Sequence, residues 1–168
     1  MNEKNLKENG ILIRPFNLDD IDFVISGQLE LYELEYGFKS DIWKSYVIDG
    51  VHDLVDQFDS KKDCMYILEH DGLPMGCAAI THVDDITAKF RFFFVDPKLR
   101  GKGAGHKLLD MSVKFCVDNG YKHVYLWTFS TLYAARHLYE RVGFKIIDTR
   151  ENNEWGNPIL EELWEMEL

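Results

Sequence analysis

A basic, glycine-rich segment, DPKLRGKGAGHKLLD at residues 96–110, directly precedes an apolar run with helical spacing. The first N–H groups of a helix have no partner within it and lie at the positive end of the helix dipole, so they bind anions. Glycines there let an anion approach the backbone without a Cβ in the way, and cations add positive charge. The glycines are Gly101, Gly103 and Gly105, and the cations beside them are Arg100 and Lys102. The segment is therefore a candidate phosphate or pyrophosphate site, with a plain glycine-rich turn as the alternative.

The glycine spacing differs from that of two well-known nucleotide-binding loops. A P-loop has the pattern GxxxxGK[ST], whereas Lys102 is followed by Gly103 instead of Ser or Thr. A dinucleotide-binding loop has the pattern GxGxxG, and here the third glycine comes one residue early. A protein that binds nucleotide phosphates is therefore disfavoured.

Composition and charge exclude several classes of protein. The chain has 168 residues, 46% hydrophobic and 14% aromatic, which suits one domain with a buried core. No apolar run approaches the roughly 18 residues that span a bilayer, so we expect no membrane partner. Residues 1–10 lack the apolar stretch of a secretory signal, so we expect a flexible leader there and a cytoplasmic protein. The 19 basic and 29 acidic residues leave no basic face for nucleic acid and slightly favour a cationic substrate.

Cysteine and histidine spacing gives no sign of a metal site. Cys64, Cys77 and Cys116 lie far apart in no CxxC pattern, so we expect reduced thiols in the core. The six histidines show neither HxxxH nor HExxH spacing. We therefore expect no bound metal.

Hydrophobic periodicity predicts the elements that position the glycine-rich segment. Expected strands cover residues 11–16, 88–95, 122–129, 144–151 and 159–168, with a hairpin over 64–83. Expected helices cover residues 17–37, 40–58, 104–120 and 130–143, and Gly50 is a possible break in the second. These elements predict one mixed α/β domain over residues 11–168.

Two segments together resemble a known family. The first is the R-x-x-G-x-G pattern at 100–105, which follows an apolar strand ending FFFVDP. The second is AARHLYERVGFK at 134–145, which is similar to the family segment A-x-x-L-Y-E-K-x-G-F. In this combination, residues 11–168 resemble the GCN5-related N-acetyltransferase (GNAT) superfamily. The resemblance implies a mixed, mostly antiparallel sheet of about seven strands, splayed at the cofactor site and flanked by about four helices.

A narrower resemblance concerns one group within this superfamily. Four segments, at 31–38, 83–97, 126–144 and 151–168, are similar to the acetyltransferase half of bacterial fusions with a MarR-type winged-helix regulator. Nothing in the 168 residues has the features of a DNA-reading half, so we expect no nucleic-acid partner. The chain is then either free-standing or part of a fusion.

The resemblance implies transfer of an acetyl group from acetyl-CoA to a primary amine, small molecule or peptide, by direct attack. The strands at 88–95 and 122–129 would splay to admit the pantetheine arm, and the N–H groups of residues 100–105 would hold the pyrophosphate. An N–H near residues 93–95 would polarise the thioester carbonyl. The implied cofactor-binding residues are Phe93, Phe94, Val95, Arg100, Gly101, Lys102, Gly103, Ala104, Gly105 and Thr131. Thr131 is included because Leu132 stands where the family often has an asparagine.

Tyr139, in the LYE segment, is the implied acid that protonates the leaving thiolate. A phenol with a pKa near 10 is close to a thiol with a pKa of about 8.5, so this proton transfer is nearly matched. A core tyrosine is the alternative.

Many relatives carry an acidic residue on the strand before the glycine-rich loop, where this chain has only Lys89 and Arg91. We therefore choose Glu35 as the base, with a solvated helix face as the alternative.

Tyr32 and Tyr36 are candidate acceptor-binding residues, with core packing as the alternative.

The missing strand carboxylate and the resemblance to fusions also suggest a second function. The chain could be a non-catalytic acyl-CoA sensor that acts through a partner. The last strand could pair within the sheet or with a second subunit, so a homodimer stays open.

Overall fold

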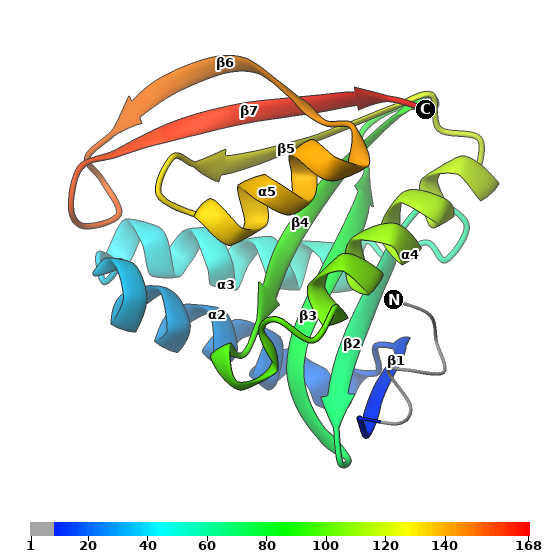
Figure 1. Cartoon of the computed structure of the whole chain (residues 1–168), viewed down its shortest axis with the longest axis horizontal. Helices are drawn as coiled ribbons and strands as arrows, with labels where there is room; N and C mark the ends of the chain where they lie inside the picture. The colour runs from blue at the N-terminus through cyan, green and yellow to red at the C-terminus, as the bar shows by residue number, and fades with distance from the viewer. Residues whose placement is uncertain (1–8) are drawn as a thin grey trace.

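The computed structural model describes residues 9–168 and contains one seven-stranded sheet with the order β1-β2-β3-β4-β5-β7-β6 (Figure 1). Neighbouring strands are antiparallel except β4 and β5, which are parallel. The strands are β1 (Ile11–Pro15), β2 (Cys64–His70), β3 (Leu73–His82), β4 (Thr87–Val95), β5 (His123–Phe129), β6 (Lys145–Asn152) and β7 (Ile159–Glu167). The predicted mostly antiparallel sheet is confirmed. Most of the predicted leader, residues 1–8, lies outside the described residues.

Four α-helices of the described chain cover the two faces of the sheet (Figure 1). They are α2 (Ile21–Tyr36), α3 (Asp41–Asp56), α4 (Ala104–Asp118) and α5 (Tyr133–Val142), with short 3-10 turns η1 (Leu18–Asp20) and η2 (Pro97–Leu99). The core on one face contains buried side chains of α4 and α5, and the core on the other contains those of α2 and α3. Because both faces are covered, residues 76–80 of β3 are all buried. Cys64, Cys77 and Cys116 are free and buried, as expected.

Capping residues set the ends of the two N-terminal helices. The Asn17 side chain accepts a hydrogen bond from the Asp19 N–H, and Ser40 Oγ accepts one from the Trp43 N–H. Gly37 ends α2 in the left-handed conformation, with φ 71°. The expected break at Gly50 is wrong, because α3 runs through it. Gly50 faces β4, where a Cβ would lie 2.8 Å from an Arg91 side-chain nitrogen, so it permits close packing.

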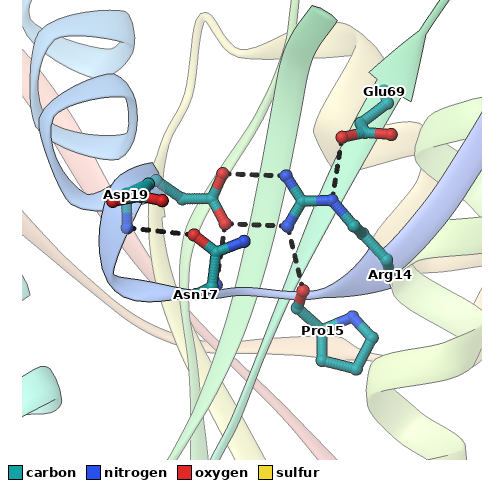
Figure 2. Close-up of polar contacts among 6 residues, drawn as sticks. Arg14, Pro15, Asn17, Asp19 and Glu69 are labelled. Carbon is teal, nitrogen blue, oxygen red and sulfur yellow. Dashed lines mark hydrogen bonds and ion pairs between the residues drawn. The ribbon is translucent and has the colours of Figure 1, made fainter. Parts of the chain in front are cut away.

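Arg14 ties the start of α2 to the edge of the sheet. Figure 2 shows its guanidinium reaching Glu69 of β2 and the Pro15 carbonyl. The same guanidinium donates two hydrogen bonds of 2.8 Å to the carboxylate of Asp20, which precedes α2 and is buried. These hydrogen bonds lower the pKa of Asp20. Arg14 thereby fixes the position from which α2 crosses the sheet towards the site.

Candidate active site

The site begins where the two parallel strands separate. β4 and β5 pair over three residues only, Thr87–Lys89 with His123–Tyr125, and Figure 1 shows them diverging from there. β4 also carries a bulge, since Phe92 and Phe93 together stand opposite Ala78 of β3. Phe92 has φ 56°, a strained left-handed conformation for a bulky residue. The bulge and the divergence leave a gap in the middle of the sheet.

Two cavities lie along this gap. The large cavity, about 430 Å³, lies between the end of β4, the glycine-rich loop and α5. The small cavity, about 90 Å³, lies between β4, β5 and α3. The two share Tyr32, Phe93 and Leu132, so they meet at the bulge of β4.

The glycine-rich loop presents free backbone donors to the large cavity. Gly101 and Gly103 have φ angles of 77° and 80°, which residues other than glycine rarely adopt. Among the described residues, no acceptor takes a hydrogen bond from the N–H groups of residues 101–106. Gly105 faces Phe93 and Leu138, where a Cβ would lie 3.4 Å from each side chain. The loop therefore has the donors and the open space that an anion such as a pyrophosphate needs.

Glu35 and Arg100 form an ion pair of 2.8 Å at the large cavity. This pair joins the end of α2 to the glycine-rich loop. Tyr32, one turn earlier on α2, donates a hydrogen bond of 3.2 Å to the carbonyl of Phe93. Tyr36 lines the large cavity as well, and burial raises its pKa to about 12. The last turns of α2 are therefore fixed against both β4 and the loop.

Tyr139 lines the small cavity from α5 and is 4% exposed. Its ring packs among Phe90, Phe93, Phe144 and Trp164, at centroid distances of 5.9–6.2 Å. Within the described chain its hydroxyl makes no hydrogen bond, and burial raises its pKa well above the usual value. The phenol therefore keeps its proton at neutral pH, and burial makes it a weaker acid than the exposed phenol assumed from the sequence.

Most of the predicted site residues come together at these cavities. The large cavity is lined by Tyr32, Glu35, Tyr36, Phe93, Phe94, Val95, Arg100, Gly101, Gly103, Ala104 and Gly105. Lys102 and Thr131 are exposed and line neither cavity, whereas Leu132 lines both. Phe92 and Phe94 pack in the core beside α2 and α3.

Sequence analysis gave no role to several residues that line the cavities. Ala134, Ala135 and Leu138 of α5 border the large cavity, and their spacing in the AARHLYERVGFK segment could have indicated a shared helix face. Trp155 borders the small cavity from the β6–β7 loop. Its carbonyl accepts a hydrogen bond of 3.1 Å from the Lys39 N–H, which holds this loop against the α2–α3 connection. No sequence signal links two segments so far apart.

Within residues 9–168 no helix is both long and apolar enough to cross a membrane. The same residues hold no group of three or more His, Cys, Asp or Glu placed to bind a metal ion.

Comparison with known proteins identifies the family. The family model for the Acetyltransferase (GNAT) family matches residues 29–144, which include β4, the glycine-rich loop, β5 and α5. The chain belongs to the GNAT family of acetyltransferases. The acetyltransferase YjgM of Escherichia coli is 26% identical over 148 residues, covering 86% of this chain and 87% of that protein. Human N-acetylaspartate synthetase is 31% identical over 121 residues, covering 68% of this chain and 40% of that protein.

A solved structure shares the fold of this GNAT protein. The acetyltransferase yncA of Salmonella typhimurium, solved with acetyl-CoA, has a TM-score of 0.76 and 17% identity, covering 95% of each chain. The predicted GNAT family and fold are therefore confirmed. The protein is an N-acetyltransferase of this family.

Proposed function

We propose that the large cavity holds the pyrophosphate and pantetheine arm of acetyl-CoA and that the small cavity holds the acceptor amine. One observation carries this division: the two cavities meet at Phe93, in the gap between β4 and β5. The free N–H groups of residues 101–106 supply donors for the pyrophosphate at one end of the large cavity. The thioester would then lie at the junction, within reach of an amine in the small cavity.

The transfer proceeds by direct attack in this proposal. The neutral amine nitrogen forms a bond with the thioester carbonyl carbon, the C–S bond breaks, and the acetyl group stays on nitrogen. The leaving thiolate takes the proton of the Tyr139 hydroxyl. A backbone N–H of the β4 bulge stabilises the negative charge that develops on the carbonyl oxygen.

The base that accepts the amine proton has no assigned residue in this mechanism. Glu35 is engaged by Arg100, and we propose that it orients this guanidinium beside the pyrophosphate site. The use of Glu35 as the base stays a prediction, and so does a cofactor contact from Lys102 or Thr131. Solvent at the mouth of the small cavity can also receive the proton.

Release of free CoA thiol from acetyl-CoA, measured with a panel of amines and amino acids, tests the activity. Tyr139→Phe should lower kcat by 10-fold or more while leaving acetyl-CoA affinity unchanged. Tyr133→Phe is the matched control, because Tyr133 lies on the same helix, is exposed and lines neither cavity. Binding of acetyl-CoA without thiol release from any amine would favour the sensor alternative. Equal turnover of Tyr139→Phe and Tyr133→Phe would remove Tyr139 from the mechanism.

Five further points from the sequence stay proposals. We propose that residues 11–168 act as one domain, since all seven strands belong to one sheet. We also propose a cytoplasmic location and a small-molecule or peptide amine as acceptor. The similarity to the acetyltransferase half of MarR-type fusions remains a prediction, which the chain length in the native source would test. The homodimer also remains a prediction, which the mass of the native protein would test.

A further inference from the structure

The small cavity is lined by two cations that form no ion pair within the described chain. Lys89 and Arg91 come from β4, and neither forms an ion pair with any described carboxylate. Lys89 is mostly buried, and burial together with the charge of Arg91 lowers its pKa to about 8. In a chain with net charge −10, two such cations at one cavity point to a negatively charged ligand.

The fold makes specific room for Arg91. Because of the bulge, Arg91 and Phe92 both face α3, although they are consecutive in the strand. The Arg91 guanidinium stacks 4.5 Å from the centre of the Phe92 ring, and α3 has Gly50 at this point. A Cβ on Gly50 would lie 2.8 Å from Arg91 Nη2, so any larger residue would displace the guanidinium. The cation is therefore held in the cavity wall by its surroundings.

Two buried polar atoms beside these cations have no partner. Trp43 Nε1 and Thr128 Oγ1 are completely buried and make no hydrogen bond within the described chain. Their residues are 5% and 6% exposed, and both line the small cavity. An indole N–H only donates, and a hydroxyl can donate, so both suit an acceptor such as a carboxylate oxygen. Buried polar atoms without partners are rare, so each one calls for a specific explanation.

Among the described residues, one carboxylate lines the small cavity, and it is already neutralised. Glu161 is 2% exposed, and Arg150 donates to it at 2.6 Å while Asn152 donates at 3.3 Å. Arg150 in turn stacks on Trp127 at 4.2 Å. The remaining ionisable residues of the lining are tyrosines, which are neutral at pH 7. The uncompensated charge of the cavity is therefore that of Lys89 and Arg91.

We propose that the acceptor is a small amine that also carries a carboxylate, and that Arg91 and Lys89 bind this carboxylate. Trp43 Nε1–H and the Thr128 hydroxyl supply two further hydrogen bonds. This rests on the proposed function, because it takes the small cavity as the acceptor site. The volume of about 90 Å³, against about 300–1,000 Å³ for drug-sized ligands, suits a molecule of amino-acid size. The local charge thus reverses the preference for a cationic acceptor that the overall composition suggested.

The test compares amino acids with the amines that remain when their carboxylate is removed, such as alanine with ethylamine and phenylalanine with phenethylamine. Thiol release from acetyl-CoA should show kcat/KM at least 10-fold higher for the amino acid in the preferred pair. Arg91→Met should remove most of that preference, and Lys89→Met should reduce it. Lys145→Met is the matched control, because Lys145 is an exposed strand cation that lines neither cavity.

The outcomes separate this inference from the proposed function. Thermal shift with acetyl-CoA shows that each variant folds, because neither Lys89 nor Arg91 lines the large cavity. If no amine of either kind is acetylated, the proposed function itself fails. Acetylation of plain amines or polyamines with no preference for the amino acid would overturn only the carboxylate site. Acetylation of phosphoethanolamine but of no amino acid would overturn it as well, since the anion recognised would then be a phosphate.

Discussion

Replacing Thr128 by valine should stabilise the free protein and weaken its function at the same time. The hydroxyl of Thr128 is buried without a partner, and valine replaces it by a methyl group of similar size. An unsatisfied buried polar group costs about 1–3 kcal/mol, so Thr128→Val should raise the free energy of unfolding by about 2 kcal/mol. For a chain of this length the melting temperature would rise by about 4–8 °C. Urea unfolding should show a higher midpoint with an unchanged slope.

The same substitution removes one of the hydrogen bonds that we propose for the carboxylate of the acceptor. A hydrogen bond to a charged group contributes about 1.5–3 kcal/mol, so kcat/KM for the preferred amino acid should fall by about 10-fold or more. Affinity for acetyl-CoA should be unchanged, because Thr128 does not line the large cavity.

Ser112→Ala is the control for the stability arm. The Ser112 side chain is fully buried, but its hydroxyl already donates to the Leu108 carbonyl at 2.8 Å, so removing it should bring no gain. A lower unfolding midpoint for Thr128→Val would refute the reasoning, because the hydroxyl would then be satisfied in the free protein.

Two further substitutions test the electrostatics of the site and of its support. Below pH 8, Lys89→Met should have a higher free energy of unfolding than the wild type, because the buried lysine is charged in both the folded and the unfolded chain. Between pH 8 and 10.5 this difference in the free energy of unfolding should become smaller, because the unfolded wild-type chain binds more protons than the folded one. Urea midpoints at pH 7, 8.5 and 9.5 check this, and a constant margin would contradict it. Arg14→Met should cost about 2–3 kcal/mol at pH 7, because it leaves the buried Asp20 carboxylate without its partner. The pKa of Asp20 is lowered in the folded state, so this loss should shrink as the pH falls below 3.8, the unperturbed value.

Local sequence features predicted the strands and helices well, because they depend on neighbouring residues. The capping side chains of Asn17 and Ser40, and the glycine that ends α2, act within a few residues of their own position. The glycine-rich loop was found for the same reason, since a phosphate site at a helix start needs only consecutive residues. Gly50 was misjudged because its purpose is contact with β4, which periodicity along α3 does not reveal.

The small cavity could not be predicted in this way. Its walls come from α3, β4, β5 and the β6–β7 loop, with Trp43 and Trp155 more than a hundred residues apart in the chain yet 4.9 Å apart between ring centres. The sequence shows that β4 carries Lys89 and Arg91 and has no acidic residue. Their sequence neighbours do not show whether these two side chains face solvent or a cavity. That depends on the divergence of β4 from β5 and on the bulge at Phe92.

The sequence by itself determined the family and the glycine-rich loop, because each depends on short contiguous motifs. The tertiary structure alone decided that Glu35 meets Arg100 at the large cavity, away from the small cavity, and that two uncompensated cations line the latter. The physical reason is that ion pairing, burial and unsatisfied donors are properties of distance in space. They arise only when strands and helices from distant parts of the chain pack together.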